Sequence, residues 1–437
     1  MRHCGGGGGR GGALLHHHAR RRITSSSAHA AAAAADFKYF SPLAPNRIKT
    51  GSEKWDRYNL PIQISSPLRY ADVQPKDVIP AWVADMDFQA PPNVLQALRA
   101  RVDHGVFGYA HATSDVYTAI RQRHGLASDD QGIIVLPGLV VALNVLARAL
   151  AAEGEAIMTT TPVYPPFFTS AKNQARSSAQ IPLVTDASGV VRMDLDAMHR
   201  RCLEKPSVKA LLLCSPHNPT GRVWTRDELL AVVDLCRRHA LVLVSDEVHC
   251  DLVLSRRARF VSALGLGYDD RLVLLHSPSK TFNLAGLGCA YAVVPDVQLR
   301  AKVRAAAKGV SADVNALAYP ALVAAYSPEA ELWRRELVEY LRGNADFLAS
   351  ALRAPVFAFS PPEATYLAWI DATRTGRVDV ARALLDEAGV AVNDGATFFG
   401  EHPQQGRGWF RLNFACARDT LERIVDRLER WARSGPR

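Results

Sequence analysis

A lysine in a short polar segment is the first candidate for chemistry in this chain. Lys280 lies in the stretch SPSKTFNLAG at 277–286, directly after the apolar run Arg271–His276, which predicts a buried parallel strand. In open α/β sheets ligands bind beyond the carboxyl ends of the strands, where Lys280 would lie. A lysine there can form a Schiff base with an aldehyde cofactor. Taken alone, the position is equally typical of a solvated loop residue.

Three more predicted strands end next to residues that could do chemistry. These strands and the residues that follow them are Lys209–Cys214 with Asn218, Ala240–Ser245 with Asp246, and Gly132–Leu136 with Gly138. Each pattern alone is also typical of a turn, a helix cap or a hinge. Together they place an amide, a carboxylate, a backbone anion site and a lysine at one edge of one sheet. This combination predicts a site for pyridoxal phosphate.

The phosphate of that cofactor is a dianion and needs N–H and hydroxyl donors. Gly138 lets the backbone approach closely, and a helix expected to begin near Leu139 and Val140 offers its positive end. Ser277 and Ser279 add hydroxyl groups on either side of Pro278. We therefore expect this group of residues to bind the phosphate.

The ring of the cofactor accepts electrons only while its nitrogen stays protonated, so an anion should face it. Asp246 suits this role, because a carboxylate about 3 Å from the ring nitrogen in a partly desolvated site contributes on the order of several kcal/mol. Asn218 can donate to the ring oxygen. Lys280 is expected to hold the resting cofactor and, once displaced by substrate, to move the Cα proton.

Seven segments of the chain resemble those of fold-type I pyridoxal phosphate enzymes, the class I/II aminotransferase superfamily. Within it, the chain resembles the MalY/PatB group of cystathionine β-lyase-like carbon–sulfur lyases. The segments span roughly residues 40–435 and are WVADMDF at 82–88, FGY at 107–109, TPVYPPF at 161–167, PHNPTGRVW at 216–224, SDEVH at 245–249, SKTFN at 279–283 and FRLNF at 410–414. Their length makes a chance agreement implausible.

The resemblance implies roles that spacing alone does not indicate. Tyr164 would stack on the cofactor ring, and Arg411 would bind the α-carboxylate of the substrate through its planar fork of donors. Tyr109 would reach the active site of a partner subunit and act there in catalysis and substrate binding. From the residues alone, Tyr164 could also belong to the core, and Arg411 could be an ordinary arginine on a strand surface.

Two positions depart from the pattern of many aminotransferases in this superfamily. Gly288 stands eight residues after Lys280, where an arginine often grips the phosphate, and His249 stands three residues after Asp246, where a tyrosine is common. The resemblance implies that both changes are typical of the lyase group, which favours a lyase over a transaminase. His249 could donate to the ring oxygen or could be a buried histidine behind the site.

The order of predicted elements and the resemblance together imply an α/β protein of fold type I. Strands and helices alternate from about residue 108 to 326, which predicts a large cofactor-binding domain with a mainly parallel, seven-stranded sheet. A smaller α+β domain is expected at 327–437, with a long helix near 329–354, strands at 366–370 and 409–414 and a closing helix near 420–433. Residues 36–107 are expected to pack on the small domain and on a partner subunit.

Composition agrees with a large enzyme that binds small molecules. The net charge of +9 includes five arginines within residues 1–35, so the rest of the chain carries about +4 and shows no basic stripe. We expect no nucleic-acid partner, no metal and no membrane span, since no apolar run approaches 18 residues. The seven cysteines, an odd number without a Cys-x-x-Cys pair, indicate free thiols in a reducing compartment, and we expect a cytoplasmic location.

Residues 1–35 form a low-complexity tail that we expect to be disordered. The segment is rich in arginine, serine and alanine and has no acidic residue, which is typical of an organelle transit peptide. An upstream start codon in a GC-rich gene would give a similar stretch. We favour the second interpretation, because the segment has no amphipathic period.

The predicted activity is β-elimination of cysteine S-conjugates, with cystathionine as the first named substrate and thiol, pyruvate and ammonia as products. We expect a homodimer with shared active sites. An aminotransferase is the first alternative, since it shares every step up to removal of the Cα proton. A regulatory protein that keeps the fold and binds another protein is the second alternative, although Lys280, Asp246 and Asn218 are all present.

Overall fold

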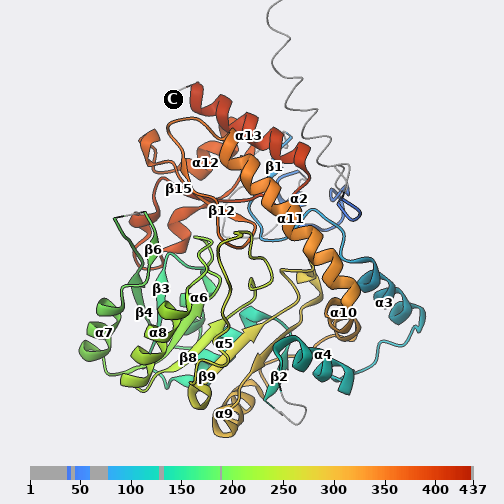
Figure 1. Cartoon of the computed structure of the whole chain (residues 1–437), viewed down its shortest axis with the longest axis vertical. Coiled ribbons are helices and arrows are strands. Elements are labelled where there is room, and N and C mark those ends of the chain that lie inside the picture. The colour runs from blue at the N-terminus through green and yellow to red at the C-terminus, as the bar shows by residue number, and fades with distance from the viewer. Residues whose placement is uncertain (1–36, 41–44, 60–76, 127–131, 188, 435–437) are drawn as a thin grey trace, which may run out of the picture.

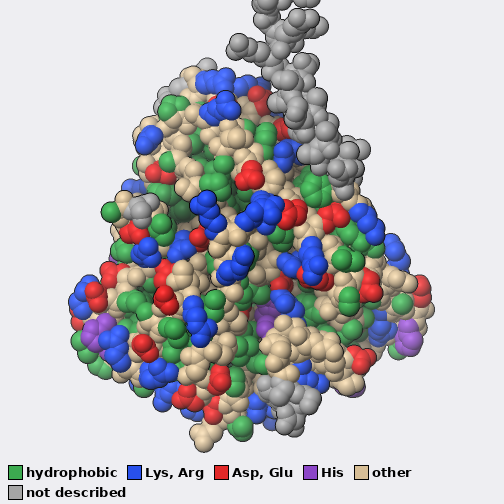
Figure 2. Space-filling model, in the orientation of Figure 1, with side chains coloured by type: hydrophobic (Ala, Val, Ile, Leu, Met, Phe, Trp, Pro, Cys, Tyr) green, Lys and Arg blue, Asp and Glu red, His purple; other side chains and the backbone are tan. Residues whose placement is uncertain are grey.

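The structure is a computed structural model that describes residues 37–40, 45–59, 77–126, 132–187 and 189–434. The tail at residues 1–35 lies outside the described residues. Figure 1 shows a lower lobe of strands and surrounding helices, and an upper lobe that holds the C-terminal elements. On the face shown in Figure 2, basic and acidic side chains are interspersed. None of the described helices is long and apolar enough to cross a membrane.

The lower lobe is organised around a seven-stranded sheet with the strand order β2-β10-β9-β8-β7-β3-β4. All neighbouring strands are parallel except β10, which runs antiparallel to both β2 and β9. The predicted mainly parallel, seven-stranded sheet is therefore confirmed. The strands are β2 Ile133–Leu136, β3 Ala156–Thr161, β4 Ser177–Pro182, β7 Val208–Cys214, β8 Val242–Asp246, β9 Leu272–His276 and β10 Ala290–Val293.

The strands are apolar along their whole length because helices cover both faces of the sheet. In β7, Leu212 packs into the core with α5, α6 and α9, whereas Leu211 packs into the core with α7 and α8. A short hairpin of β5 Val184–Thr185 and β6 Val191–Arg192 lies outside the sheet. The helices of this lobe are α4 Ser114–His124, α5 Leu139–Leu150, α6 Pro166–Asn173, α7 Leu195–Glu204, α8 Arg226–Arg238, α9 Val297–Ala307 and α10 Ala318–Ala325.

The upper lobe packs three helices against an antiparallel sheet with the order β11-β12-β15-β14. Its elements agree with the predicted long helix, strands and closing helix to within a few residues. They are α11 Pro328–Ala351, β11 Ala358–Phe359, β12 Leu367–Asp371, α12 Val380–Ala383, β13 Val390–Ala391, β14 Asn393–Asp394, β15 Trp409–Asn413 and α13 Arg418–Arg433.

The N-terminal elements pack mainly on the upper lobe and on α10. They are α2 Glu53–Asn59, β1 Ile79–Pro80 and α3 Pro92–Asp103. Strand β1 pairs in parallel with β13, and α3 packs on α10 and α11. Between β1 and α3 the chain has no helix or strand, and it bonds to both lobes: Asp87 N–H donates to Ala415 O at 2.9 Å and Met86 N–H to Asn283 Oδ1 at 2.9 Å.

The sheet brings the four predicted strand ends to one edge. The register places Cys214 of β7 opposite Asp246 of β8, and Asp246 opposite Leu275 of β9. Strand β10 runs the other way, so its first residue, Ala290, lies opposite Leu136, the last residue of β2. The segments that follow β2, β7, β8 and β9 therefore converge at this edge.

Gly221 marks a close contact between the lobes next to this edge. Its φ is +72°, and a Cβ at this position would lie 2.3 Å from Pro362 Cβ of the upper lobe. The backbone of Ala364 also donates to Gly221 O at 2.9 Å. Glycine is needed here for two reasons, the left-handed conformation and the absence of space.

We expect Gly221→Ala to lower the free energy of unfolding by about 3 kcal/mol, because the strained conformation and the overlap with Pro362 add. The control is Gly154→Ala, where φ is +81° but no atom lies within 4 Å of the added Cβ. That variant should lose only about 1 kcal/mol. Urea unfolding measures both. Equal losses in the two variants would show that the contact with Pro362 is unimportant.

Candidate active site

A cavity of about 480 Å³ opens at this edge, between the sheet and the upper lobe. Its volume is in the range of small-molecule sites. The residues that line it include every predicted site residue except Tyr109: Gly138, Leu139, Val140, Tyr164, Asn218, Asp246, His249, Ser277, Ser279, Lys280 and Arg411. Residues distant in sequence are thus brought together as the strand ends suggested.

Lys280 follows β9 and extends into the cavity. Its Nζ donates to Ala84 O at 2.9 Å, and Tyr366 Oη donates to the same carbonyl oxygen at 2.9 Å. Burial lowers the pKa of Lys280 to about 8, and the nearby cation of Arg411 acts in the same direction, whereas Asp85 and Asp246 oppose it. The amine is therefore easier to deprotonate than an ordinary lysine.

Asp246 ends β8 and is buried at the floor of the cavity. Its Oδ1 accepts a hydrogen bond from Val248 N–H at 3.1 Å. Burial raises its pKa to about 7, although that hydrogen bond and the Lys280 cation lower it. A buried carboxylate with so few partners suits a cationic ligand, such as a protonated pyridine ring.

Arg411 lies on β15, so the upper lobe contributes a side chain to the site. Its guanidinium donates to Asn218 Oδ1 at 3.0 Å, Asn393 Oδ1 at 2.7 Å and Trp82 O at 3.1 Å. Burial lowers its pKa to about 10. Its Nε is buried and has no hydrogen-bond partner among the described residues. The side chain is thus held in place with one donor still free, which suits a carboxylate ligand.

Helix α5 presents free backbone donors to the cavity. Helices α7, α8, α9 and α11 are capped by a side chain that accepts from their first turn, but Gly138 before α5 offers none. Gly138 has φ 152° and ψ 160°, a conformation that favours glycine strongly. The first N–H groups of α5 therefore stay available for an anion.

The two predicted serines differ in what they can donate. Ser277 Oγ already donates to Cys289 O at 2.6 Å and accepts from Ser279 N–H at 3.1 Å. Its hydroxyl proton is therefore engaged within the turn. Ser279 is partly exposed to the cavity, and its hydroxyl is the better candidate donor to a phosphate.

The two departures from the aminotransferase pattern have physical consequences. At Gly288 φ is +57°, and a Cβ there would lie 3.0 Å from Pro137 O, so an arginine would be strained and would crowd the turn before α5. His249 is buried with Nδ1 unpartnered among the described residues, and burial together with Lys280 and Arg411 lowers its pKa to about 3. The imidazole is therefore neutral.

Sequence reasoning missed several contributors to this site. The cavity is also lined by Trp82, Val83, Ala84 and Asn393, and Tyr366 holds the Ala84 carbonyl from outside. The segment WVADMDF carries the resemblance, but nothing in its residue types indicated a backbone role. Asn393 lies in a stretch without any motif, so only the folded chain reveals it.

Tyr109 is the predicted residue that the single chain does not bring to the site. It is fully exposed, and its neighbours Val106 and Phe107 are also exposed to more than half. These side chains belong to the segment between α3 and α4. An exposed apolar segment of this kind is typical of a surface that another chain covers.

A second cluster of candidate ligands lies apart from these residues. Cys250, Asp251 and His276 offer ligand atoms within 4.8 Å of one another. Arg123 pairs with Asp251, so a cation already occupies this carboxylate. His276 Nδ1 bonds to Glu247 O at 3.0 Å, and we assign no ligand to the cluster.

The chemistry of the lining fits pyridoxal phosphate. The open end of α5 and Ser279 suit its phosphate, and Asp246 suits its ring nitrogen. Lys280 is a desolvated amine able to bond to its aldehyde carbon, and Tyr164 lies in the same lining. Each charged part of the cofactor would thus meet a group that lacks a full set of partners.

The pKa of Asp246 leads to a pH test on cofactor-free protein. The value of about 7, raised from 3.8, means that the folded state keeps a proton that the unfolded state releases between pH 4 and 7. This contribution to stability is complete below pH 4 and is lost as pH rises through 7. From pH 5 to 7 we expect the wild type to lose about 2 kcal/mol more unfolding free energy than Asp246→Asn.

Urea unfolding at pH 5, 6 and 7 measures this difference. Glu247, whose pKa burial also raises to about 7, is present in both proteins; the charge of Asp246 has a smaller effect on that pKa than burial and hydrogen bonds do, so most of the Glu247 contribution cancels in the comparison. Parallel pH dependences of the two proteins would show that Asp246 is already ionised in the cofactor-free cleft.

Known proteins are similar to this chain in both sequence and fold. Residues 77–428 match the family described as aminotransferase class I and II. The chain is 33% identical over 396 residues to cystathionine β-lyase PatB of Bacillus subtilis. The alignment covers 88% of this chain and 97% of that protein. It is 34% identical over 360 residues to protein MalY of Escherichia coli, with 80% and 90% covered.

One similar solved structure contains the expected cofactor. Cystalysin from Treponema denticola, which contains pyridoxal 5′-phosphate, has a TM-score of 0.81 and 27% identity, with 91% of this chain and 99% of that chain covered. The expected fold type and cofactor are thereby confirmed. This chain belongs to the class I and II aminotransferase family of pyridoxal phosphate enzymes, in the group that includes PatB and MalY.

Proposed function

We propose that this chain catalyses β-elimination from cysteine S-conjugates and releases a thiol, pyruvate and ammonia. The observation that carries the proposal is one cleft that combines a desolvated lysine, a buried carboxylate and an arginine with a free donor: Lys280, Asp246 and Arg411. Relatives named cystathionine β-lyase support cystathionine as the first substrate to test.

The upper lobe and the sheet divide the work of binding. Arg411 binds the α-carboxylate through its unpaired Nε, while Asn218 and Asn393 keep its guanidinium in place. The N-terminal end of α5 and Ser279 would bind the phosphate, and Tyr164 would stack on the ring. Asn218 would also face the ring oxygen, beside the neutral His249.

Lys280 and Asp246 have different roles in removal of the Cα proton. When bound, pyridoxal phosphate supplies the electron sink that makes the Cα proton of the substrate acidic. Asp246 would face the ring nitrogen and keep it protonated. Lys280 accepts the Cα proton at Nζ, which its lowered pKa leaves partly unprotonated near neutral pH. The thiolate then leaves from Cβ.

Elimination is favoured over transamination by two positions. An aminotransferase would use the same residues until the Cα proton is removed. Gly288 and His249 stand where many transaminases of the superfamily keep arginine and tyrosine, and the positive φ and the nearby Pro137 carbonyl at Gly288 favour glycine. A purely regulatory role has less support, because Lys280, Asp246 and Asn218 all line the cleft.

We further propose a cytoplasmic location. In the part of the chain that the structure describes, all six cysteines are free thiols, five of them buried, which suits a reducing compartment. The transit-peptide alternative depends on residues 1–35, which lie outside the described residues.

Purified protein with cofactor should release pyruvate and ammonia from L-cystathionine without any added keto acid. The reason is that a thiolate at Cβ leaves readily once the Cα proton is gone. Coupled assays for pyruvate and for free thiol measure the products. Lys280→Ala, the matched control, should release neither. Product that appears only with an added keto acid would assign the chain to the aminotransferases instead.

We propose that the active enzyme is a homodimer in which each subunit contributes Tyr109 to the other's cleft. Exposed apolar side chains on several elements support this arrangement, among them Val106, Phe107, Tyr109, Val140 and Val310. Val140 also lines the cleft, so the surface to be covered reaches the site itself. Two-fold pairing would cover such a patch on both chains at once.

Mixing two inactive variants tests the shared site. Tyr109→Ala and Lys280→Ala should each lose activity, but a mixed dimer has one cleft with both residues intact. After exchange of subunits we expect up to about a quarter of wild-type activity, since half of the dimers are mixed and each has one complete site. Mixing Lys280→Ala with Asp246→Ala, which share a cleft, gives no such complementation if Tyr109 alone crosses between subunits. Restored activity in this control mixture would contradict the proposed exchange of Tyr109 between subunits.

A further inference from the structure

An irregular loop contacts the two basic side chains of the cleft, Lys280 and Arg411, from one side. The loop comprises residues 82–88, where the described chain forms neither helix nor strand. Its Ala84 carbonyl accepts from Lys280 Nζ at 2.9 Å, and its Trp82 carbonyl accepts from Arg411 Nη2 at 3.1 Å. The position of these carbonyls therefore affects both side chains, although the loop has no sheet or helix of its own to fix it.

Two asparagines pin the loop from the side of the cleft. Asn283, three residues after Lys280, donates to Met86 O and Phe88 O at 2.8 Å each. Asn413, two residues after Arg411, donates to Val83 O and Asp85 O at 2.6 Å each. The turn that carries the lysine and the strand that carries the arginine thus also hold the loop.

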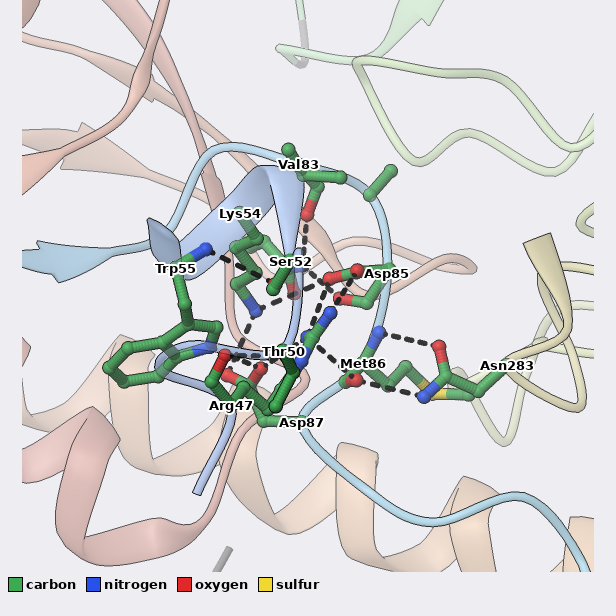
Figure 3. A network of polar contacts seen from close by, with 12 residues as sticks. Arg47, Thr50, Ser52, Lys54, Trp55, Val83, Asp85, Met86, Asp87 and Asn283 are labelled. Atoms are coloured by element: carbon green, nitrogen blue, oxygen red, sulfur yellow. Dashed lines mark hydrogen bonds and ion pairs between the residues drawn. The ribbon is translucent and has the colours of Figure 1, made fainter. Parts of the chain in front are cut away.

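The opposite side of the loop is held by charges from the N-terminal segment (Figure 3). Arg47 donates to both oxygens of Asp85, at 3.0 and 2.6 Å, and to Asp87 Oδ1 at 2.7 Å. Lys54 Nζ donates to Asp87 Oδ2 at 2.9 Å, and Trp55 Nε1 to Asp87 Oδ1 at 2.8 Å. Asp87 therefore has a partner on each oxygen.

This cluster is more buried than stability alone would require. The side chains of Lys54 and Asp87 are 1% and 2% exposed, and a buried ion pair is seldom more stabilising than apolar residues of the same volume. Its geometry, however, is specific: moving the loop would separate opposite charges away from water. Such a pair is well suited to hold one conformation of a segment that lacks regular structure.

We propose that Arg47, Lys54, Trp55 and Asp87 form an N-terminal latch, a set of positioning residues that fixes loop 82–88 and so keeps the Ala84 carbonyl against Lys280. None of the four lines the cleft. The latch acts through Ala84 and through Asp85, which it also holds. The proposal rests on Lys280 being the reactive amine, but it does not depend on which reaction follows.

The test uses the state of Lys280 in cofactor-free, full-length protein. The charged groups that face this amine are Arg411 from β15, Asp246 from β8 and Asp85 from the loop, with the neutral His249 beside them. The Ala84 carbonyl stabilises the ammonium form by accepting its hydrogen bond, and Asp85 stabilises it by charge. A loop that drifts away removes both effects and admits water to the amine, which reduces the effect of burial, so the pKa of Lys280 should change.

The principal variant is the double substitution Lys54→Met and Asp87→Ala, which removes the buried pair without leaving one charge unpaired. Trace acetylation of Lys280, followed by mass spectrometry from pH 6 to 10, measures its pKa. We expect the value to differ from that of the wild type by about one unit. Hydrogen exchange should show the backbone amides at positions 86 and 87 exchanging at least about tenfold faster.

A second variant and a matched control keep the test decisive. Trp55→Phe removes only the hydrogen bond to Asp87 and should shift both readouts in the same direction by less, so it replaces the double variant if that one fails to fold. Arg427→Met is the control: Arg427 is 18% exposed, close to the 21% of Arg47, and pairs with Asp77 at 2.6 Å outside the loop. It should change neither readout.

The possible results separate clearly. Faster exchange in the loop together with a changed pKa of Lys280, both absent from Arg427→Met, supports the latch. Unchanged exchange shows that the loop is fixed without the cluster, and faster exchange with an unchanged pKa shows that the loop does not position Lys280; either result overturns the proposal. Equal effects in Arg427→Met would report general loosening and overturn it as well. Because no substrate is used, the outcome is independent of the elimination assay.

Discussion

Removal of water from four ionisable side chains in one cleft is the constraint on which the rest of the site depends. Burial raises the pKa of Asp246 and lowers those of Lys280, Arg411 and His249, so each group is held in a less favourable environment than water. A ligand with a cationic ring and two anionic ends supplies the missing opposite charges. The cleft is therefore matched to pyridoxal phosphate carrying an amino acid more than to an apolar ligand of the same size.

The residues of the cleft come from two separate sheets, one in each lobe. The parallel strands β7, β8 and β9 deliver Asn218, Asp246 and Lys280 to one edge, and the hydrogen-bonded register leaves little freedom in their spacing. Arg411 arrives on a separate sheet. The loop 82–88 then joins the two, since its backbone bonds to both lobes. This loop has no hydrogen-bonded strand partner in the described part of the chain. Polar side chains from three distant segments hold it instead.

Much of this could be predicted where a local pattern carries a direct physical meaning. Continuous apolar runs such as Leu272–His276 indicated strands buried on both faces, and the polar residue after each run indicated the edge of the sheet. The hydroxyl of Ser277 shows the limit of such reasoning. Its residue type suggested a phosphate donor, but the nearby Cys289 carbonyl takes its proton, and that partner approaches only through the antiparallel strand β10.

The sequence by itself determined which residues could do chemistry and the strand ends at which they stand, because the apolar runs and the residues that end them are local features of the chain. Tertiary structure alone decided how burial changes those residues and which backbone groups join them. The pKa values of Asp246 and Lys280, the free Nε of Arg411 and the Ala84 carbonyl all depend on packing between segments up to some 330 residues apart. Tyr109 shows the same limit, since its surroundings in one chain are solvent.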